Sequence, residues 1–148
     1  MILQEDRIQF VEEINGIGFI NDSKSVSVGA TKWALEQFTG PIILIAGGKD
    51  RKDDFMSIKG IVREKVKKMV LIGEAKDRLK EIFSDVVKVE KVKTMTDAVE
   101  TAFNSAQRRD CILLSPMCPS FDMFRDFQDR ADHFKKIVFA LGTTHFVK

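Results

Sequence analysis

The sequence lacks long apolar runs, a cysteine framework and a strong charge of either sign. No apolar stretch in its 148 residues approaches the roughly 20 residues that a membrane-spanning helix needs. The two cysteines, Cys111 and Cys118, lack metal-ligand spacing, so we expect reduced thiols and neither a disulfide framework nor a metal site. A formal net charge of +2 is too small to predict nucleic-acid binding.

Three further features are missing from the sequence. Residues 1–6 do not pair a basic segment with an apolar core, so we expect no signal peptide and a cytoplasmic location. There are no repeats, low-complexity tracts or linkers, and the length suits one domain, residues 1–148. The phosphate-binding P-loop pattern, Gly-x-x-x-x-Gly-Lys-Ser/Thr, does not occur either. We therefore expect this chain to have no triphosphate-binding loop of its own.

Hydrophobic periodicity predicts alternating strands and helices. The strands are expected at 7–13, 17–20, 41–46, 69–72, 86–89 and 111–114, and the helices at 30–38, 55–66, 75–83, 94–106 and 120–141. Asn15-Gly16 predicts a hairpin between the first two strands, because both central residues of a type I′ turn need positive φ. The remaining strands should pair in parallel through right-handed crossovers. The fold class is therefore α/β, a six-stranded mixed sheet with five parallel strands, one antiparallel strand and helices on both faces.

The clearest candidate site lies within residues 111–130, between a buried strand and the last helix. Ser120 is the expected N-cap of that helix, with Asp122 in its first turn and Gly142 as its C-terminal stop. Phe124 and Phe134 should face the sheet. Ligands of open α/β sheets bind beyond the carboxyl ends of strands, where helix N-termini attract anions. The alternative is that Ser120 only caps the helix and the phenylalanines only fill the core.

Two other polar loops follow expected strands. Residues 21–27 carry Asp22, Lys24 and several hydroxyls, which suits contact with polyphosphate or ribose, or equally a helix-capping loop. Residues 47–54 begin with Gly-Gly and continue with cations, which suits an anionic ligand or simply a turn beside solvated charges. If these loops leave the same sheet edge, Lys24, Arg51 and Ser120 should share an electropositive cleft.

Six ordered motifs resemble the C-terminal domain of the Mur ligases. They are Arg7, Asn15-Gly16, Asn21-Asp22-Ser23-Lys24, Ile45 to Asp50 with Asp54-Phe55, Leu71 to Ala75, and Leu114-Ser115-Pro116-x-Cys118-x-Ser120-Phe121-Asp122-x-Phe124-x-x-Phe127-x-x-Arg130. They cover nearly the whole chain and are most similar to the ligases that use ATP to add D-glutamate to UDP-N-acetylmuramoyl-L-alanine for peptidoglycan precursors. The resemblance implies a Rossmann-like third domain. It places the P-loop, the Mg²⁺ ligands and a modified lysine in a central domain and the nucleotide-sugar site in a first domain, so neither is in this chain and no turnover is expected from it alone.

The resemblance also implies residue roles, with no catalytic residue and no metal ligand within this domain. Arg7, Asp22 and Lys24 would lie on the ATP and phosphate side. The D-glutamate site would be lined by Arg51, Ser120, Phe121, Phe127 and, where the family usually has a threonine, Val26. Partners would be D-glutamate, UDP-N-acetylmuramoyl-L-alanine and the central ATP-binding domain, with no nucleic acid and no membrane.

Several positions depart from the family pattern. Arg51 replaces a lysine, Asp6 a histidine, Pro119 a small residue and Ala131 a glycine. Val26 cannot donate the hydrogen bond of a threonine, which affects affinity or amino-acid choice. Two alternatives stay open: the equivalent domain of another Mur ligase or of a folylpolyglutamate synthase, and a non-catalytic α/β binding module that kept the fold.

Overall fold

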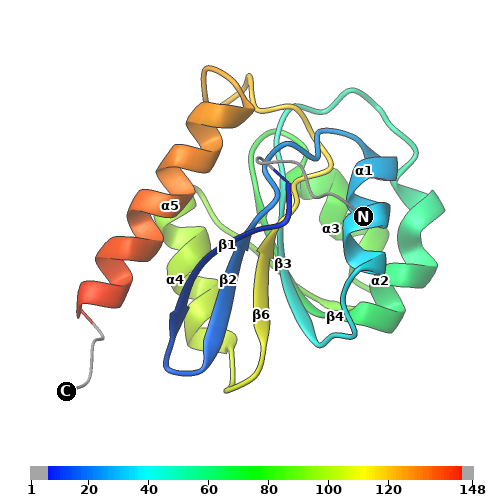
Figure 1. Ribbon diagram of the computed structural model, residues 1–148. Coiled ribbons are helices and arrows are strands. Elements are labelled where there is room, and N and C mark those ends of the chain that lie inside the picture. Colours follow the sequence, from blue (N-terminus) through cyan, green and yellow to red (C-terminus); the bar gives the residue numbers. More distant parts are fainter. Residues whose placement is uncertain (1–6, 145–148) are drawn as a thin grey trace.

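A six-stranded mixed sheet forms the middle layer of the computed structural model, which describes residues 7–144 (Figure 1). The strands are β1 (Gln9–Ile14), β2 (Ile17–Asn21), β3 (Ile42–Gly47), β4 (Val66–Ile72), β5 (Lys88–Lys91) and β6 (Cys111–Leu114). The helices are α1 (Val28–Glu36), the 3-10 helix η1 (Phe55–Ile58), α2 (Lys59–Lys65), α3 (Lys76–Phe83), α4 (Met95–Ser105) and α5 (Phe127–Thr144). None of the helices in the described range is long and apolar enough to cross a membrane.

The strand order is β1-β2-β6-β3-β4-β5, with β1 antiparallel to β2 and every other neighbouring pair parallel. This confirms the predicted α/β fold class. The hairpin between β1 and β2 is also confirmed, since Asn15 and Gly16 both have positive φ, 53° and 81°. The fold therefore begins with the antiparallel pair and continues with crossovers.

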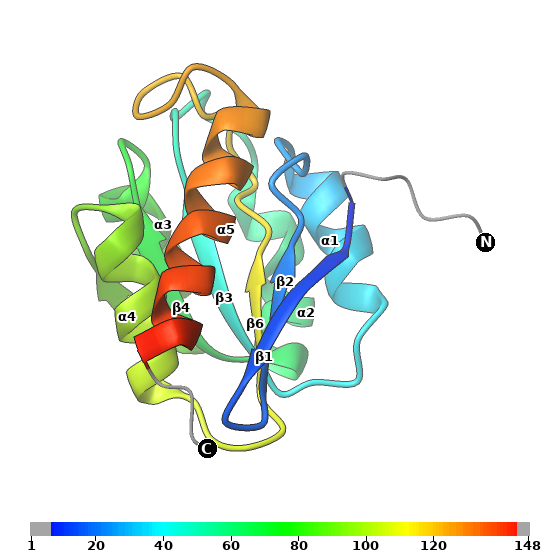
Figure 2. The same cartoon turned by 60° about the vertical axis from the view of Figure 1, so that its left-hand side comes forward.

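Helices cover both faces of the sheet, as Figures 1 and 2 show. The core on one face includes side chains of α1, α2 and α3, and the core on the other includes those of α4 and α5. β3 serves both cores, because Leu44 lies in the first and Ile43 and Ile45 lie in the second. Successive side chains of a strand point to opposite faces, so a strand covered on both sides is apolar throughout. All six residues of β3 are buried.

The last helix begins later than the sequence predicts. Ser120 does not cap α5; its carbonyl accepts the backbone N–H groups of Met123 and Phe124 in a turn, 3.1 and 2.8 Å. Asp126 takes the capping role instead, because its side chain accepts the N–H of Asp129 at 2.8 Å. Asp122 therefore lies in the loop and not in the first turn of a helix.

The end of α5 and two other boundaries also differ from prediction. Gly142 does not stop the helix, which continues to Thr144. The predicted helix at 55–66 is divided into η1 and α2, and Val66 opens β4 instead. β5 lies two residues later than expected, at Lys88–Lys91. Phe134 is fully buried against the sheet as predicted, whereas Phe124 packs only half-buried at the edge of that core.

Candidate functional site

Three loops converge at one edge of the sheet. They are the β2 loop (residues 22–27), the β3 loop (48–54) and the β6 loop (115–126), which follow three adjacent parallel strands and lie together at the top of Figure 1. Backbone bonds join them: the N–H of Met117 donates to the carbonyl of Ser25 (3.1 Å), and that of Lys49 to the carbonyl of Pro119 (2.9 Å). The loops that carry Lys24, Arg51 and Ser120 are therefore neighbours.

The glycines of this edge serve loop packing. A Cβ on Gly48, which has φ of +146°, would lie 2.4 Å from the carbonyl oxygen of Pro119. At Gly73, after β4, a Cβ would lie 2.6 Å from a carboxylate oxygen of Asp122. The Asp122 side chain could turn aside, but a Cβ on Gly73 would also lie 2.8 Å from the Cα of Gly48. The close approach of the β3 loop to its neighbours therefore requires glycine at both positions. The Gly-Gly turn after β3 thus brings backbone close to backbone.

Arg130, on the first turns of α5, lies at the junction of these loops. Its side chain is 1% exposed. The guanidinium donates to Ser23 Oγ (2.9 Å), to the Ser23 carbonyl (2.8 Å) and to the Cys118 carbonyl (2.9 Å). Ser23 Oγ in turn donates to the carbonyl of Phe127 at 2.8 Å. Burial lowers the pKa of Arg130 to about 10, so the group remains charged at neutral pH.

Sequence reasoning gave Arg130 no role of its own. A signal was available, because Arg130, Phe134 and Val138 recur every four residues and so share one face of a helix. A charged residue on an apolar helical face needs a specific set of polar partners. Those partners are carbonyls and a hydroxyl from distant loops, which no local pattern identifies.

Asp22 is the second buried charge of the edge. Its Oδ2 accepts hydrogen bonds from the hydroxyls of Ser25 and Ser115, and its Oδ1 lies 3.7 Å from Arg7 Nε. Burial raises the pKa of Asp22, against the opposing effects of the two hydroxyls and of Arg7. Arg7 Nε, Arg7 Nη2 and Asp22 Oδ1 have no hydrogen-bond partner among the described residues. The Arg7 guanidinium also stacks over Trp33, 4.6 Å from the ring centre.

The structure brings some of the predicted ligand residues together. Arg51 donates from Nη2 to the carbonyl of Val26 (3.0 Å) and to Asp53 (3.2 Å), and its side chain is 48% exposed. Lys24 Nζ lies 6.0 Å from the ring centre of Phe127. These contacts form two pairs at the same edge, each joining residues from different loops or elements.

The other predicted ligand residues are placed differently. Ser120 is buried at the turn of the β6 loop, and Phe121, directly after it, is 72% exposed. Asp6, one of the departures from the family pattern, lies outside the described residues. Pro119 and Ala131 are buried, Pro119 in the β6 loop and Ala131 in α5.

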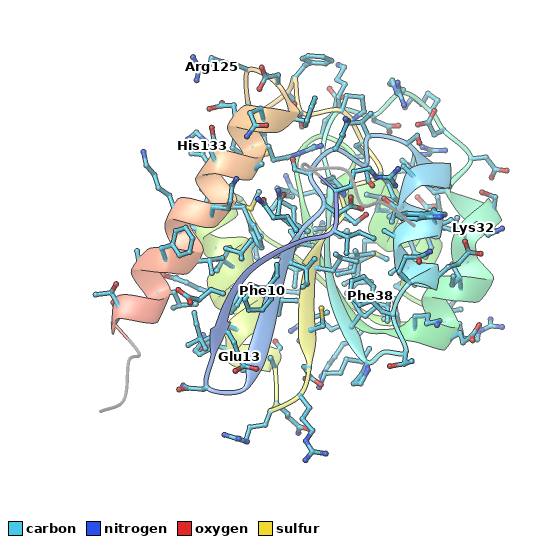
Figure 3. The ribbon with its side chains drawn as sticks, in the orientation of Figure 1. Phe10, Glu13, Lys32, Phe38, Arg125 and His133 are labelled. Carbon is cyan, nitrogen blue, oxygen red and sulfur yellow. The ribbon has the colours of Figure 1, made fainter. Side chains whose placement is uncertain are left out.

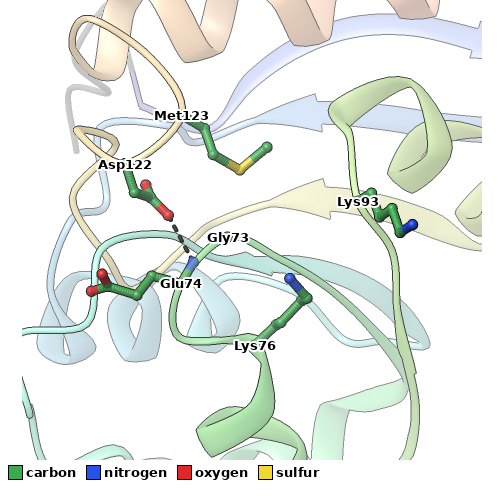
Figure 4. Close-up of a pocket in the computed structure, with 6 residues that line it drawn as sticks. All are labelled: Gly73, Glu74, Lys76, Lys93, Asp122 and Met123. Carbon is green, nitrogen blue, oxygen red and sulfur yellow. Dashed lines mark hydrogen bonds between the residues drawn. The ribbon is translucent and has the colours of Figure 1, made fainter.

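A hollow of about 320 Å³ opens at this edge between the loops after β4, β5 and β6 (Figure 4). It is lined by Gly73, Glu74, Lys76, Lys93, Asp122 and Met123. Asp122 accepts the N–H of Glu74 at 2.8 Å, and Glu74 pairs with Lys49 Nζ at 3.1 Å. Lys24, Arg51 and Ser120 do not line this hollow, so a cleft shared by those three residues stays a prediction.

The cysteines are poor nucleophiles in this environment. Both are free, and burial raises the pKa of Cys111 and of Cys118 to about 12. Within residues 7–144 no group of three or more His, Cys, Asp or Glu side chains could hold a metal ion. What the edge offers instead is a mixture of cations, carboxylates and hydroxyls, with Phe121 on the β6 loop and Phe127 at the start of α5.

Comparison with known proteins places this architecture in a family. Residues 6–118 match the model described as Mur ligase, glutamate ligase domain. The chain is 44% identical over 145 residues to the UDP-N-acetylmuramoylalanine--D-glutamate ligase of Caldicellulosiruptor bescii. It is 41% identical over 137 residues to the ligase of the same name from Chloroherpeton thalassium. These matches cover 95% and 93% of this chain but 31% and 29% of the relatives, so the chain spans less than a third of their length.

A solved structure shows the same fold at low sequence identity. It is the bifunctional folylpolyglutamate synthase/dihydrofolate synthase from Yersinia pestis, with a TM-score of 0.63, 15% identity, and coverage of 94% of this chain and 31% of that chain. Identity at that level shows likeness of fold alone, whereas the family match covers residues 6–118, which include the β2 and β3 loops and the start of the β6 loop. The chain belongs to the Mur ligase, glutamate ligase domain family.

Proposed function

We propose that this domain binds the incoming amino acid, and one side of ATP, in an enzyme that joins D-glutamate to UDP-N-acetylmuramoyl-L-alanine during peptidoglycan precursor synthesis. The observation that carries the proposal is the convergence of the β2, β3 and β6 loops at the carboxyl edge of the sheet. In open α/β sheets this edge is where ligands bind. The names of the relatives about 40% identical to this chain supply the reaction.

Arg51 is the residue that best suits a dicarboxylate ligand. Its guanidinium can hold a carboxylate through two parallel hydrogen bonds, and it is half exposed. The bond to the Val26 carbonyl fixes the side chain across the gap between the β3 and β2 loops. A ligand carboxylate would replace or share the contact to Asp53. Phe127 and the exposed Phe121 would supply the apolar wall.

Two departures from the family pattern, Arg51 and Val26, meet in this contact and act in different ways. Arginine has a longer, planar reach than the lysine usual in the family, and that reach spans to the neighbouring loop. The acceptor on Val26 is its backbone carbonyl, so this bond does not depend on the valine side chain. The missing threonine hydroxyl would therefore affect a contact to the ligand and leave the Arg51 bridge intact.

Arg7, Asp22 and Lys24 form the ATP side of the proposal. Arg7 and Asp22 present two N–H donors and one carboxylate oxygen without partners among the described residues. A ribose hydroxyl both donates and accepts, so it fits such a set, as an ordered water would. Lys24 would contribute a positive charge near the transferred phosphoryl group. Mg²⁺ and the P-loop would come from the central domain of the complete enzyme.

In the proposed reaction ATP phosphorylates the carboxylate of the nucleotide-linked substrate. The amine of D-glutamate then attacks the acyl phosphate, which releases phosphate and leaves an amide. The residues of this chain would orient D-glutamate and neutralise its carboxylates. They would supply no general base and no metal ligand, so catalysis would require closure of this domain over the central one.

The test uses the natural protein that carries this chain, including any sequence before Met1. Purified protein is incubated with ATP, Mg²⁺ and UDP-N-acetylmuramoyl-L-alanine, and with D-glutamate, L-glutamate, D-aspartate or meso-diaminopimelate in turn. We expect amide formation and ADP release with D-glutamate. Product with a different amino acid would assign the chain to another Mur ligase, and glutamate addition to a folate would favour a folylpolyglutamate synthase. No product with any pair would favour a non-catalytic module.

A further inference from the structure

Arg130 is a buried cation bonded only to neutral groups. It is one of the largest fully buried side chains of the domain, and its three hydrogen bonds go to two carbonyls and one hydroxyl. In the part of the chain that the structure describes, no carboxylate forms an ion pair with it. Burying a charge in this way is unfavourable, and an apolar residue would fill the space without that penalty. Its presence therefore suggests a role beyond packing.

The bonds of Arg130 connect segments that are far apart in the sequence. Ser23 belongs to the β2 loop, Cys118 to the β6 loop and Arg130 to α5. Ser23 Oγ, which accepts from Arg130, also donates to the Phe127 carbonyl, so a second hydrogen bond joins the β2 loop to the start of α5. The β3 loop is next to this group, because a Cβ on Gly48 would lie 3.3 Å from Arg130 Nη1.

Each anchored position is close in sequence to a residue with a proposed ligand role. Lys24 directly follows Ser23, Ser120 lies two residues after Cys118, and Phe127 begins the helix that carries Arg130. Lys24 Nζ and the Phe127 ring lie 6.0 Å apart, on two segments that the Arg130 bonds hold together. A shift of either segment would therefore move Phe127, of the proposed amino-acid site, relative to Lys24, of the proposed phosphate side.

We propose that Arg130 is a positioning residue, whose three hydrogen bonds hold the β2 and β6 loops against α5 in the arrangement that binds the amino acid. It touches no ligand itself. The loop-holding part stands on the contacts above, while the effect on amino-acid binding rests on the proposed function. Preorganisation of this kind matters because displacements of about 1 Å at a binding site can change rates by about 100-fold.

The first experiment measures amide hydrogen exchange in this chain, for Arg130→Lys and Arg130→Met. Lysine keeps the charge but cannot reach three acceptors, and methionine keeps much of the volume without charge. Arg125→Met is the matched control, since Arg125 is 88% exposed and lies on the outer side of the structure, as His133 does (Figure 3). Ser23→Ala is a milder variant for use if the Arg130 variants fail to fold.

The reporter amides are those whose bonds join the loops, Met117 and Lys49, together with Ser25 within the β2 loop. The reference amides are those of Leu79, in α3, and Val92, directly after β5, because neither belongs to the three loops. We expect exchange of the reporters to rise at least about tenfold in both Arg130 variants, with the references and the control within about twofold. An equal rise at all amides would show a merely structural role, and an unchanged reporter rate would also overturn the proposal.

The second experiment uses the natural protein and measures KM and kcat for each substrate. We expect Arg130→Lys to raise the KM for D-glutamate about 10- to 100-fold while the KM for the nucleotide-linked substrate stays within about twofold. If the wild-type protein uses D-glutamate and the variant KM is unchanged, the positioning role is wrong. If the wild-type protein does not use D-glutamate, the proposed function fails, and the exchange experiment still decides whether Arg130 holds the loops.

Discussion

Replacing Arg51 tests the amino-acid site most directly. A charge-assisted hydrogen bond is worth about 1.5–3 kcal/mol, and each 1.4 kcal/mol is roughly tenfold in affinity, so the full range is roughly 10- to 150-fold. Arg51 is half exposed, and water weakens its pairs, so we expect the lower end of that range. In the natural protein, Arg51→Ala should therefore raise the KM for D-glutamate about tenfold. Arg51→Lys keeps the charge and should give an intermediate value.

Controls separate this effect from unfolding and from loss of positive charge in general. Arg51 lies on the surface, so its removal should change the free energy of unfolding by no more than about 0.5 kcal/mol. Lys52→Ala removes the neighbouring charge, whose side chain is more exposed, and should leave the KM for D-glutamate unchanged. The KM for UDP-N-acetylmuramoyl-L-alanine should stay the same in all three variants. An unchanged D-glutamate KM in Arg51→Ala would reject the assigned role.

Three further predictions concern the fold, pH and turnover. Phe134→Ala should lower the free energy of unfolding in urea by about 3–5 kcal/mol, and half-buried Phe124→Ala by roughly 1 kcal/mol; equal losses would contradict the core described above. Burial raises the folded-state pKa of Asp22 above its ordinary value of 3.8, so between 3.8 and the raised value the folded state holds a proton that the unfolded state has released. Stability therefore falls as pH rises through that window. Urea titrations at several pH values should therefore show the wild-type protein losing stability relative to Asp22→Asn across this pH window. Parallel plots of the free energy of unfolding against pH for the two proteins would refute the raised pKa of Asp22. This chain alone should hydrolyse no ATP, and ATPase activity above that of a heat-inactivated sample, copurifying with the chain, would contradict this.

Local patterns predicted the architecture because burial on two faces leaves a direct mark on the sequence. The continuous apolar run of β3 follows from its position in the middle of the sheet, between β6 and β4. Asn15-Gly16 encodes a turn that few other residue pairs can form. These features depend on neighbours in the sequence or on a simple period, so the sequence alone suffices.

The start of α5 was not predictable in the same way. Ser120 and Asp126 are both good N-cap residues, and local propensity does not choose between them. Which of the two residues caps α5 depends on a distant contact. Asp122 accepts the N–H of Glu74, after β4, and this bond holds the residues between Ser120 and Asp126 as a loop. The end of α5 was not predictable for a similar reason. Glycine often ends a helix, but α5 packs along β1 and continues past Gly142.

The sequence predicted which edge of the sheet carries the candidate site, but it did not predict the contacts made there. The order of strands and helices places the three loops together, because the carboxyl ends of parallel strands share one edge. Which residues would face a ligand came from the family resemblance. The two glycines show why local patterns do not give the contacts. Gly48 leaves room for the Pro119 carbonyl and Gly73 for the Asp122 carboxylate, and both of these groups belong to a loop that is distant in the sequence.

The polar residues of this edge fall into two groups by burial, and the groups should respond differently to substitution. Asp22 and Arg130 are buried and bonded to hydroxyls and carbonyls of several segments, so their loss should disturb the loops themselves. Arg51, on the β3 loop, and Phe121, on the β6 loop, are exposed, so their loss should leave the loops in place. A buried polar group without its partners is far more unfavourable than an exposed one, which explains why only the first group can fix the backbone. A substitution in the second group that altered amide exchange across the β2 and β6 loops would show that this division is wrong.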